Sequence, residues 1–474
     1  MAAPQINPFM FRTIGGTSTT LLSNLLGEWE FLDELTINKF IDSPSSSERL
    51  DNFVAKGFVS SSDTDRELFS LAAKKKLYQK WMGGLNKPSL IMVVPTLRCD
   101  HQCQYCQVSR APLHSPSHDI DRSVEDVAQF INKTADKNFK LEFQGGEPLL
   151  RQDFIVELTQ RLLELRNQLF PIVVCSALGP ELEPSFLKWA YESGVQFSVS
   201  FDGTERSHST VRRSASFDSY ERLKTQLEFL RNEGFGDRIG FVGTVNKTNC
   251  FTEPQELIDS CETLGISRLF TRPISDYGFA STTSSLLGIT PDEFIGQRRR
   301  YLMGIVDHFQ RTGRVFTDEY FSIYLNKIFR PDDNSYVDLD SPSGYGLRAC
   351  LINYDGYVYG SDEARMLFEM TKDTSLAITH VSDKKVLKTD LNLHSRLLKN
   401  TFIEETPHCE SCAYSPFCGS DPLSHLISEG DILGDKPRSA FCRTQMGMFD
   451  LIFDNLYRKT IPEELLKAWT LPSV

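Results

Sequence analysis

The chain has 474 residues, of which 40% are hydrophobic and 24% are charged, and its formal net charge is −12. This length allows about three domains, and the negative charge argues against a general nucleic-acid binder. No apolar run approaches the ~20 residues that cross a bilayer, and the first residues lack the charged-then-apolar pattern of a secretory signal. We therefore expect a soluble cytoplasmic protein without a nucleic-acid or membrane partner.

Residues 1–85 are predicted to form a small α+β unit. Short apolar runs alternate with turn residues up to about residue 60, which is typical of a few strands followed by short helices. This order indicates a winged-helix-like unit. A helix is expected over Arg66–Trp81, whose apolar residues are spaced for one face: Leu68, Leu71, Leu77 and Trp81.

From residue 89 onwards, strand-like and helix-like runs alternate. Six β/α units imply a parallel sheet with helices outside it, and six are too few to close an eight-stranded barrel. The fold class predicted for residues 86–315 is therefore α/β, a partial (β/α)6 barrel that is open at one side. Strands are expected at Leu90–Val94, Lys140–Phe143, Ile172–Cys175, Val195–Phe201, Ile239–Val245 and Arg268–Arg272, and helices at Val124–Thr134, Phe154–Leu165, Phe186–Tyr191, Tyr220–Arg231 and Glu256–Leu264.

The remainder of the chain is predicted to hold a linker and a third domain. A further helix is expected over Pro291–Arg311, and we expect its run Arg298–Arg300 to be solvated. Residues 316–347 are interpreted as a linker because turn formers crowd the second half of this segment. Residues 348–474 are rich in cysteine and end in an amphipathic helix, Met446–Tyr457.

The most informative feature is the triplet Cys99, Cys103 and Cys106, which directly follows the first predicted barrel strand. Three thiolates this close can hold one face of an iron–sulfur cube, which normally takes four cysteines, so one iron would stay open to another ligand. The alternative is a structural zinc site with His101 as fourth ligand, but His101 is tightly constrained by the cysteines on either side of it. The spacing therefore favours an incompletely ligated cluster.

Two polar loops follow later strands and are expected at the same edge of the sheet, because functional loops gather at the carboxyl ends of parallel strands. One is Gly145-Gly146-Glu147-Pro148, whose glycines allow a ligand to approach the backbone closely. The other carries Ser200 and Asp202, with an arginine downstream, Arg212 or Arg213, that offers a carboxylate a bidentate fork. The alternative for the second loop is a surface turn.

Four cysteines of the tail, Cys409, Cys412, Cys418 and Cys442, are enough for one closed iron–sulfur cluster. A zinc ribbon competes with this interpretation on spacing alone. Cys175 lies in an apolar run and is predicted to be a core thiol.

Together these motifs resemble the radical S-adenosylmethionine (SAM) superfamily with a depleted SPASM-type C-terminal extension. Over LRCDHQCQYCQVSRA, over GSDEARM (residues 360–366) and in the N-terminal unit, the chain resembles the His-Xaa-Ser-system radical SAM maturases (HxsB type). The resemblance implies a [4Fe–4S] cluster on the triplet, with the open iron chelated by SAM. It also implies one auxiliary [4Fe–4S] cluster on the tail cysteines, because Ser361 and Pro422 stand where the family has further ligands, and it leaves Cys350 as a buried thiol. The SAM-contacting residues it implies are Tyr105, Gly145, Gly146, Glu147, Pro148, Ser200, Asp202 and Arg213.

The same resemblance implies reductive cleavage of SAM to a 5′-deoxyadenosyl radical that modifies a ribosomally made His-Xaa-Ser peptide. The implied partners are the precursor peptide and an electron donor such as flavodoxin or ferredoxin. The N-terminal unit resembles modules that recognise the peptide leader, and the alternative is a domain that only packs on the barrel. Two alternatives stay open. One is a sulfatase-maturase-like oxidation of a Cys or Ser residue to formylglycine, and the other is a non-catalytic, metal-stabilised peptide-binding partner.

Overall fold

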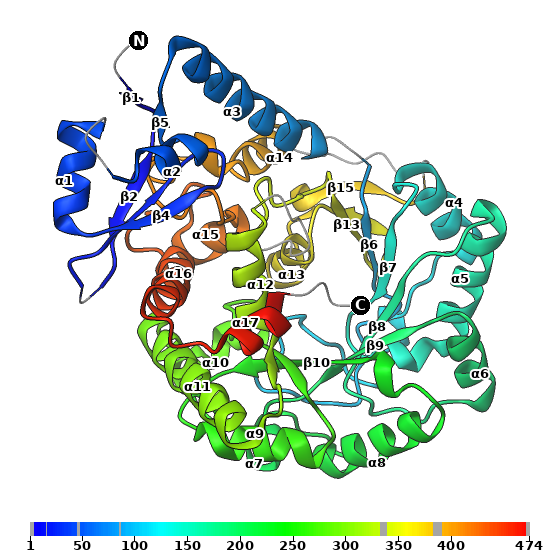
Figure 1. Ribbon diagram of the computed structural model, residues 1–474. Coiled ribbons are helices and arrows are strands. Elements are labelled where there is room, and N and C mark those ends of the chain that lie inside the picture. Colours follow the sequence, from blue (N-terminus) through cyan, green and yellow to red (C-terminus); the bar gives the residue numbers. More distant parts are fainter. Residues whose placement is uncertain are drawn as a thin grey trace.

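The computed structural model describes residues 4–15, 17–44, 48–84, 87–331, 339–382 and 391–470. Its centre is a ten-stranded sheet with the order β12-β11-β10-β9-β8-β7-β6-β13-β14-β15. Figure 1 shows this sheet curving, with helices outside it. The strands are β6 (Leu90–Val93), β7 (Lys140–Phe143), β8 (Ile172–Ser176), β9 (Gln196–Ser200), β10 (Ile239–Val245), β11 (Arg268–Pro273), β12 (Thr317–Asp318), β13 (Ala349–Ile352), β14 (Tyr357–Tyr359) and β15 (Ala377–His380).

Every pair of neighbours from β12 to β13 is parallel, and only β14 and β15 run antiparallel to their neighbours. The six predicted strands are confirmed as β6 to β11, with each end at the predicted residue or one residue from it. The parallel sheet is longer than predicted, because β12 extends one side and β13 the other. The strand β13 belongs to the cysteine-rich tail, so barrel and tail share one sheet.

The helices of the β/α units cover the outer face of the sheet. The five predicted helices of these units are confirmed within one or two residues at each end, and the further helix predicted over Pro291–Arg311 is confirmed as α11. Side-chain caps fix several starts; for example, Ser123 accepts a hydrogen bond from the Asp126 N–H at the start of α4. The helices are α4 (Val124–Thr134), α5 (Gln152–Arg166), α6 (Pro184–Glu192), α7 (Glu205–Val211), α8 (Ser219–Asn232), α9 (Pro254–Thr263), α10 (Phe279–Leu287) and α11 (Pro291–Thr312).

The prediction that the arginine run of α11 is solvated is wrong for Arg298. Its side chain is fully buried and donates to the buried carboxylate of Asp318 at 2.9 Å. Arg299, the next residue, is exposed. A buried charge needs a partner, and Asp318, at the end of β12, supplies it.

The segment 316–347 is not the linker that was predicted. It contains β12 and the helix α12 (Glu319–Phe329), whose start is capped by Asp318. Phe321 and Tyr324 of α12 are buried in the core, so this part of the chain is packed rather than connecting. Residues 332–338 of the predicted linker lie outside the described residues.

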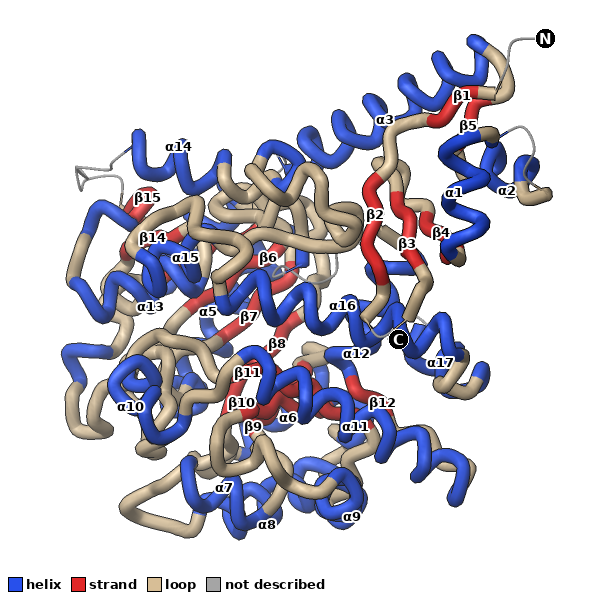
Figure 2. Tube along the Cα trace, turned by 90° about the vertical axis from the view of Figure 1, so that its left-hand side faces the viewer, coloured by secondary structure: helices blue, strands red, loops and turns tan. Residues whose placement is uncertain are grey.

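The N-terminal unit combines a three-stranded antiparallel sheet, in the order β2-β3-β4, with three helices. It has a small core of its own, and Figure 2 shows it beside the C-terminal helices. Strands precede helices as expected, but the predicted apolar face of α3 is uncovered, with Leu68 58% and Leu71 63% exposed. Its elements are β1 (Gln5–Ile6), β2 (Met10–Thr13), β3 (Thr20–Ser23), β4 (Trp29–Leu32), α1 (Glu34–Asp42), α2 (Leu50–Ala55), β5 (Val59–Ser60) and α3 (Asp63–Gly84).

The N-terminal unit is fastened to the tail of the chain. Arg12 donates twice to Asp450 at 2.7 Å, and the Ser23 hydroxyl donates to the Ala413 carbonyl at 2.6 Å. Ala413 directly follows one of the tail cysteines, so this contact reaches the predicted metal loop. The tail helices are α13 (Asp362–Thr371), α14 (Leu391–Lys399), α15 (Pro422–Glu429), α16 (Ala440–Arg458) and α17 (Glu463–Thr470). Within the described part of the chain, no helix has the length and apolar character to cross a membrane.

Candidate functional site

Cys99, Cys103 and Cys106 lie on the loop after β6 and line the wall of a central cavity of about 650 Å³. Burial raises the pKa of Cys99 well above its usual value and that of Cys103 to about 12, and neighbouring thiols of the triplet add to both shifts. A metal that binds Cys99 and Cys103 would displace the protons that burial favours on these two thiols. The structure thus brings the triplet together on one wall.

His101 is held away from the role of fourth ligand. One ring nitrogen lies 2.8 Å from the Asp100 carboxylate and the other lies 3.0 Å from the Ser219 hydroxyl. Ligand atoms of Cys99, Asp100 and His101 do lie within 4.8 Å of one another, but both nitrogens of the ring already have protein partners. This arrangement favours a three-thiol site over a zinc site closed by His101.

The Gly145-Gly146 turn packs directly against the cysteine loop. The Gly146 N–H donates to the Thr96 carbonyl at 2.9 Å, and the Glu147 N–H donates to the Arg98 carbonyl at 2.8 Å. A Cβ on Gly145 would lie 2.5 Å from the Thr96 oxygen, and one on Gly146 would overlap the backbone oxygens of the cysteine loop. Two glycines are therefore required for this close approach.

Glu147 and Pro148 lie behind the wall that the two glycines form. The Glu147 carboxylate is buried and accepts from the Ser176 hydroxyl at 2.7 Å and the Ala177 N–H at 3.0 Å. Burial raises the pKa of Glu147 to about 8, with the Asp100 charge adding to the shift. The cavity is lined by Gly145 and Gly146, so Glu147 holds the loop instead of facing the cavity.

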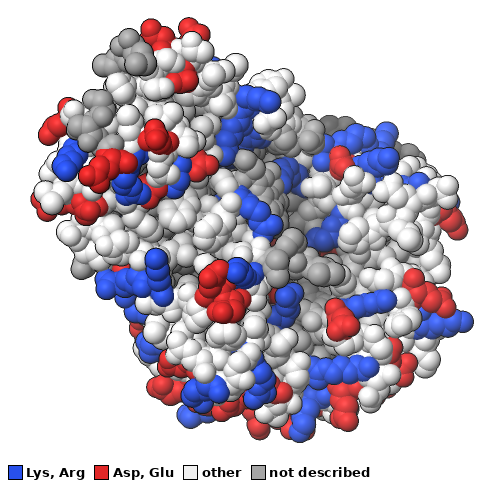
Figure 3. Space-filling view, viewed as in Figure 1, with Lys and Arg blue, Asp and Glu red and all other residues white. Residues whose placement is uncertain are grey.

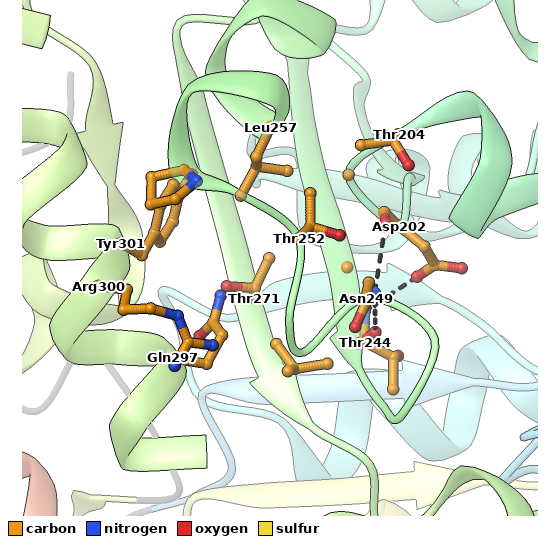
Figure 4. Close-up of a pocket in the computed structure, with 14 residues that line it drawn as sticks. Asp202, Thr204, Thr244, Asn249, Thr252, Leu257, Thr271, Gln297, Arg300 and Tyr301 are labelled. Carbon is orange, nitrogen blue, oxygen red and sulfur yellow. Dashed lines mark hydrogen bonds between the residues drawn. The ribbon is translucent and has the colours of Figure 1, made fainter. Parts of the chain in front are cut away.

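Asp202 organises a buried network under the cysteine loop. Its carboxylate accepts from the Tyr105 hydroxyl at 2.5 Å and from Arg212 Nε at 2.8 Å. Arg212 Nη1 in turn lies 3.8 Å from Cys103 Sγ. Figure 4 shows Asp202 and Asn249 beside a cavity of about 20 Å³, which has room for a single water. The Asn249 side-chain amide donates to the Asp202 carbonyl at 3.3 Å. Asp202 therefore holds Tyr105 of the cysteine loop and Arg212 in position through these hydrogen bonds.

Ser200 and Tyr105 line the central cavity, as does Arg212. Arg213, the arginine chosen from the sequence, is exposed and donates to the Thr210 carbonyl at 3.0 Å. The two arginines follow one another at the end of α7, where the chain turns, so a shift of one residue reverses the direction of the side chain. The structure brings Arg212 to the cavity and leaves Arg213 outside.

The inner wall of the sheet carries polar residues that sequence reasoning missed. Lys140, Glu142 and Gln144 line the cavity from β7 and the residue after it, with Lys140 Nζ 3.1 Å from the Glu142 carboxylate. The signal was present, because a polar residue at every second position marks one face of a strand. Cys175 lines the same cavity and its thiol lies 3.6 Å from Glu142, so the prediction of a core thiol is wrong.

The tail of the chain also reaches the central cavity. Ser361 caps the start of α13, and Asp362 and Glu363 line the cavity wall. Arg365, fully buried, donates to Asp362 at 2.6 Å and to the Val108 carbonyl at 3.0 Å. This contact ties α13 to the cysteine loop. Basic side chains also line the cavity: Arg110, Lys140, Arg212, Arg272 and Arg348.

Comparison with known proteins decides the family of this site. Residues 93–251 match the sequence model of the Radical SAM superfamily. Residues 93–251 form a radical SAM domain. Such a domain implies a [4Fe–4S] cluster and SAM, and the three thiols on one cavity wall fit that cluster.

A curated relative, the radical SAM cyclopropyl synthase TigE of Paramaledivibacter caminithermalis, is 21% identical over 267 residues, 52% of this chain and 52% of its own length. The chain thus spans about half of this relative. Among solved structures, anSMEcpe with bound AdoMet and Cp18Cys peptide has a TM-score of 0.63 at 16% identity, covering 79% of this chain and 99% of that one. The structure of SuiB of Streptococcus suis bound to precursor peptide SuiA has a TM-score of 0.53 at 15% identity, and the match covers 93% of this chain and 99% of that one. These likenesses show the fold.

Outside the radical SAM domain, the four tail cysteines line one small cavity. Cys409 and Cys412 share a turn in which the Cys412 N–H donates to the Cys409 carbonyl at 3.1 Å. Cys442 lies in the first turn of α16. Burial raises the pKa of Cys409 to about 11 and that of Cys418 well above its usual value. The set of four thiols fits a closed metal site, and Cys350, which is buried in β13, is not among the residues that line this cavity.

Proposed function

We propose that this chain is a radical SAM peptide maturase that reductively cleaves SAM and modifies a ribosomally made peptide of the His-Xaa-Ser type. The observation that carries the proposal is the wall of the central cavity. There the triplet Cys99, Cys103 and Cys106, which leaves one iron of a cube open, lies against the Gly145-Gly146 turn. The sequence resemblance supports the His-Xaa-Ser class.

The triplet would hold the [4Fe–4S] cluster, and the Gly145-Gly146 turn and Ser200 line the part of the wall where SAM would bind. When bound, the reduced cluster would supply the one electron that SAM needs to give methionine and a 5′-deoxyadenosyl radical, which takes hydrogen from carbon. The protein provides binding, orientation and exclusion of water. The helix α10 helps to hold the cysteine loop in position, because the Phe279 N–H at its start donates to the Cys106 carbonyl at 2.8 Å.

A peptide substrate suits both the cavity and the N-terminal unit. Figure 3 shows a hollow near the middle of this face with Lys and Arg side chains around it, which suits a ligand that carries carboxylates. The likeness to SuiB, whose structure holds a precursor peptide, spans 93% of this chain. The domain organisation that we propose is a leader-recognition unit, a radical SAM barrel and a tail with one auxiliary [4Fe–4S] cluster on Cys409, Cys412, Cys418 and Cys442.

The N-terminal sheet has two edges at which a leader could add a strand. At the edge of β4, the carbonyl oxygens of Trp29 and Phe31 accept from Lys56 Nζ at 2.8 Å and Arg49 Nη1 at 3.0 Å. At the other edge, Phe11 of β2 is 63% exposed. We therefore favour β2 as the edge that pairs with the leader. A flavodoxin or ferredoxin would supply the electrons.

The test of turnover is made on the anaerobically reconstituted full-length protein. With dithionite and SAM, 5′-deoxyadenosine should form, and changing Cys99, Cys103 and Cys106 together to Ala should abolish it. Iron should fall from about eight to about four per chain in that variant, because each cubane holds four irons. Cys350→Ala, a change at a buried thiol outside both sites, serves as the matched control. Absence of 5′-deoxyadenosine from the parent protein refutes the proposal.

The peptide class is tested separately. A peptide with His-Xaa-Ser repeats, encoded beside this chain, should change in mass only when SAM and reductant are present. An unchanged peptide together with continued formation of 5′-deoxyadenosine would refute the His-Xaa-Ser substrate and leave SAM cleavage standing.

A further inference from the structure

Lys436 is a buried cation at the wall of the four-cysteine cavity. It is 5% exposed and lines the same cavity as Cys409, Cys418 and Cys442. Lysine is almost never fully buried unless a partner compensates its charge. The partner of Lys436 therefore identifies what the cavity is built to hold.

Other buried cations of this protein have a carboxylate beside them. Lys327 Nζ lies 2.6 Å from Asp340, and Arg298 lies 2.9 Å from Asp318. For Lys436, no described residue has a carboxylate oxygen within 4.0 Å of Nζ. The expected counter-charge is thus missing from the described protein groups around it.

The imidazole of His425 does not replace that counter-charge. Its two ring nitrogens lie 3.4 Å from Lys436 Nζ. Each nitrogen already has a nearer partner, the Asp421 carbonyl at 2.7 Å and the Ser439 hydroxyl at 2.8 Å. The ring packs beside the ammonium group and carries no negative charge that would compensate it.

The sulfur atoms of the cavity supply the missing charge once they are thiolates. Burial lowers the pKa of Lys436, and the sulfur atoms of Cys409, Cys442 and Cys418, followed by Asp421, are the groups that oppose this shift. The positive end of α16 points to the same place, because Ser439 caps this helix and Cys442 lies in its first turn. A buried ammonium group and a helix N-terminus thus converge on four thiols.

We propose that Lys436 is the charge partner of the metal–thiolate group in this cavity and raises the reduction potential of the auxiliary cluster. This inference rests on the proposed function, which places that cluster here. Reduction adds negative charge to a cluster that four thiolates already make anionic, and net charge is one of the factors that set its potential. A cation in a buried, low-dielectric position stabilises the reduced form more than the oxidised form. Lys436 is thus a positioning residue that makes the cluster a better electron acceptor.

The test isolates the auxiliary cluster in the full-length chain with Cys99, Cys103 and Cys106 changed to Ala. In this background the midpoint potential is measured by titration with a spectroscopic readout. Lys436→Met should shift the potential to a more negative value, whereas Lys436→Arg, which keeps the charge, should stay close to the parent. Lys467→Met removes an exposed lysine of α17 and is the matched control.

Each outcome decides the proposal. Loss of the auxiliary iron in Lys436→Met, with retention in Lys436→Arg, would also support it, since Arg keeps the positive charge that Met lacks. An unchanged potential in Lys436→Met, or equal loss of iron in both variants, would overturn it. If the parent holds zinc and no iron, the auxiliary cluster of the proposed function fails, and the inference falls with it.

Discussion

Because the Gly145-Gly146 turn packs closely against the cysteine loop, Gly146→Ala should disturb the position of that loop. The new methyl group would overlap the carbonyl oxygens of Leu97 and Arg98, and these are backbone atoms that cannot rotate away. The cysteine loop or the turn must move, which strains the hydrogen bond from the Glu147 N–H to the Arg98 carbonyl. Cys99 directly follows Arg98, so its thiol should leave its position in the triplet.

The magnitude follows from two terms. Overpacking costs about 1–3 kcal/mol, and the strained hydrogen bond contributes about 1 kcal/mol, so we expect a loss of about 3 kcal/mol. In a chain of 474 residues the unfolding entropy is about 1 kcal/mol per degree, so the melting temperature should fall by only ~3 °C. The larger effect should be on metal binding, with iron falling from about eight to about four per chain.

The assay compares Gly146→Ala with Gly236→Ala after identical anaerobic reconstitution. Gly236 has open space where its Cβ would lie, so this matched control should keep both its iron and its melting temperature. Circular dichroism checks that the fold persists in both variants. Full iron loading and parental yields of 5′-deoxyadenosine in Gly146→Ala would refute the reasoning.

Three further predictions concern stability. Arg298→Ala leaves the buried Asp318 without its cationic partner and should lower the free energy of unfolding by about 3–5 kcal/mol. In urea unfolding, Arg299→Ala at the exposed next position should change it by no more than about 0.5 kcal/mol. Equal effects of the two changes would contradict the buried pair. Arg12→Ala should cost about 1 kcal/mol and speed proteolytic release of residues 1–84, an effect that Arg66→Ala should lack. Because burial raises the pKa of Glu147 from 4.5 to about 8, the folded chain keeps this proton to higher pH than the unfolded chain. The unfolding free energy should therefore fall as pH rises from about 4.5 to about 8, and Glu147→Gln should remove this component; an unchanged pH slope in that variant would count against it.

The sequence predicted the barrel well because its strands are short apolar runs between amphipathic helices, a pattern that reports burial directly. It could not reveal β12, which has two residues, or the pairing of β13 with β6, in which Ala349 lies opposite Leu90. Arg298 shows the same limit. Its solvated appearance is reversed by Asp318, a partner that only the tertiary structure brings near.

The functional site contains residues that local sequence patterns predict and others that they do not. The cysteine spacings predicted which thiols gather, because each group of ligands is fixed mainly by short loops. Cys175 was misplaced because an apolar run on a strand reads as core, although its other face lines the cavity. Lys436 lies in a loop without periodicity, so its place beside the tail thiols could be seen only in the structure.

The central claim is that the triplet holds a cube with one iron open to SAM. Its most direct test is electron paramagnetic resonance of the reduced, oxygen-free protein, with and without SAM. We predict that SAM changes the signal of the cluster on Cys99, Cys103 and Cys106, and that this change is absent when all three are Ala. A signal that SAM leaves unaltered in the fully loaded parent protein would contradict the account.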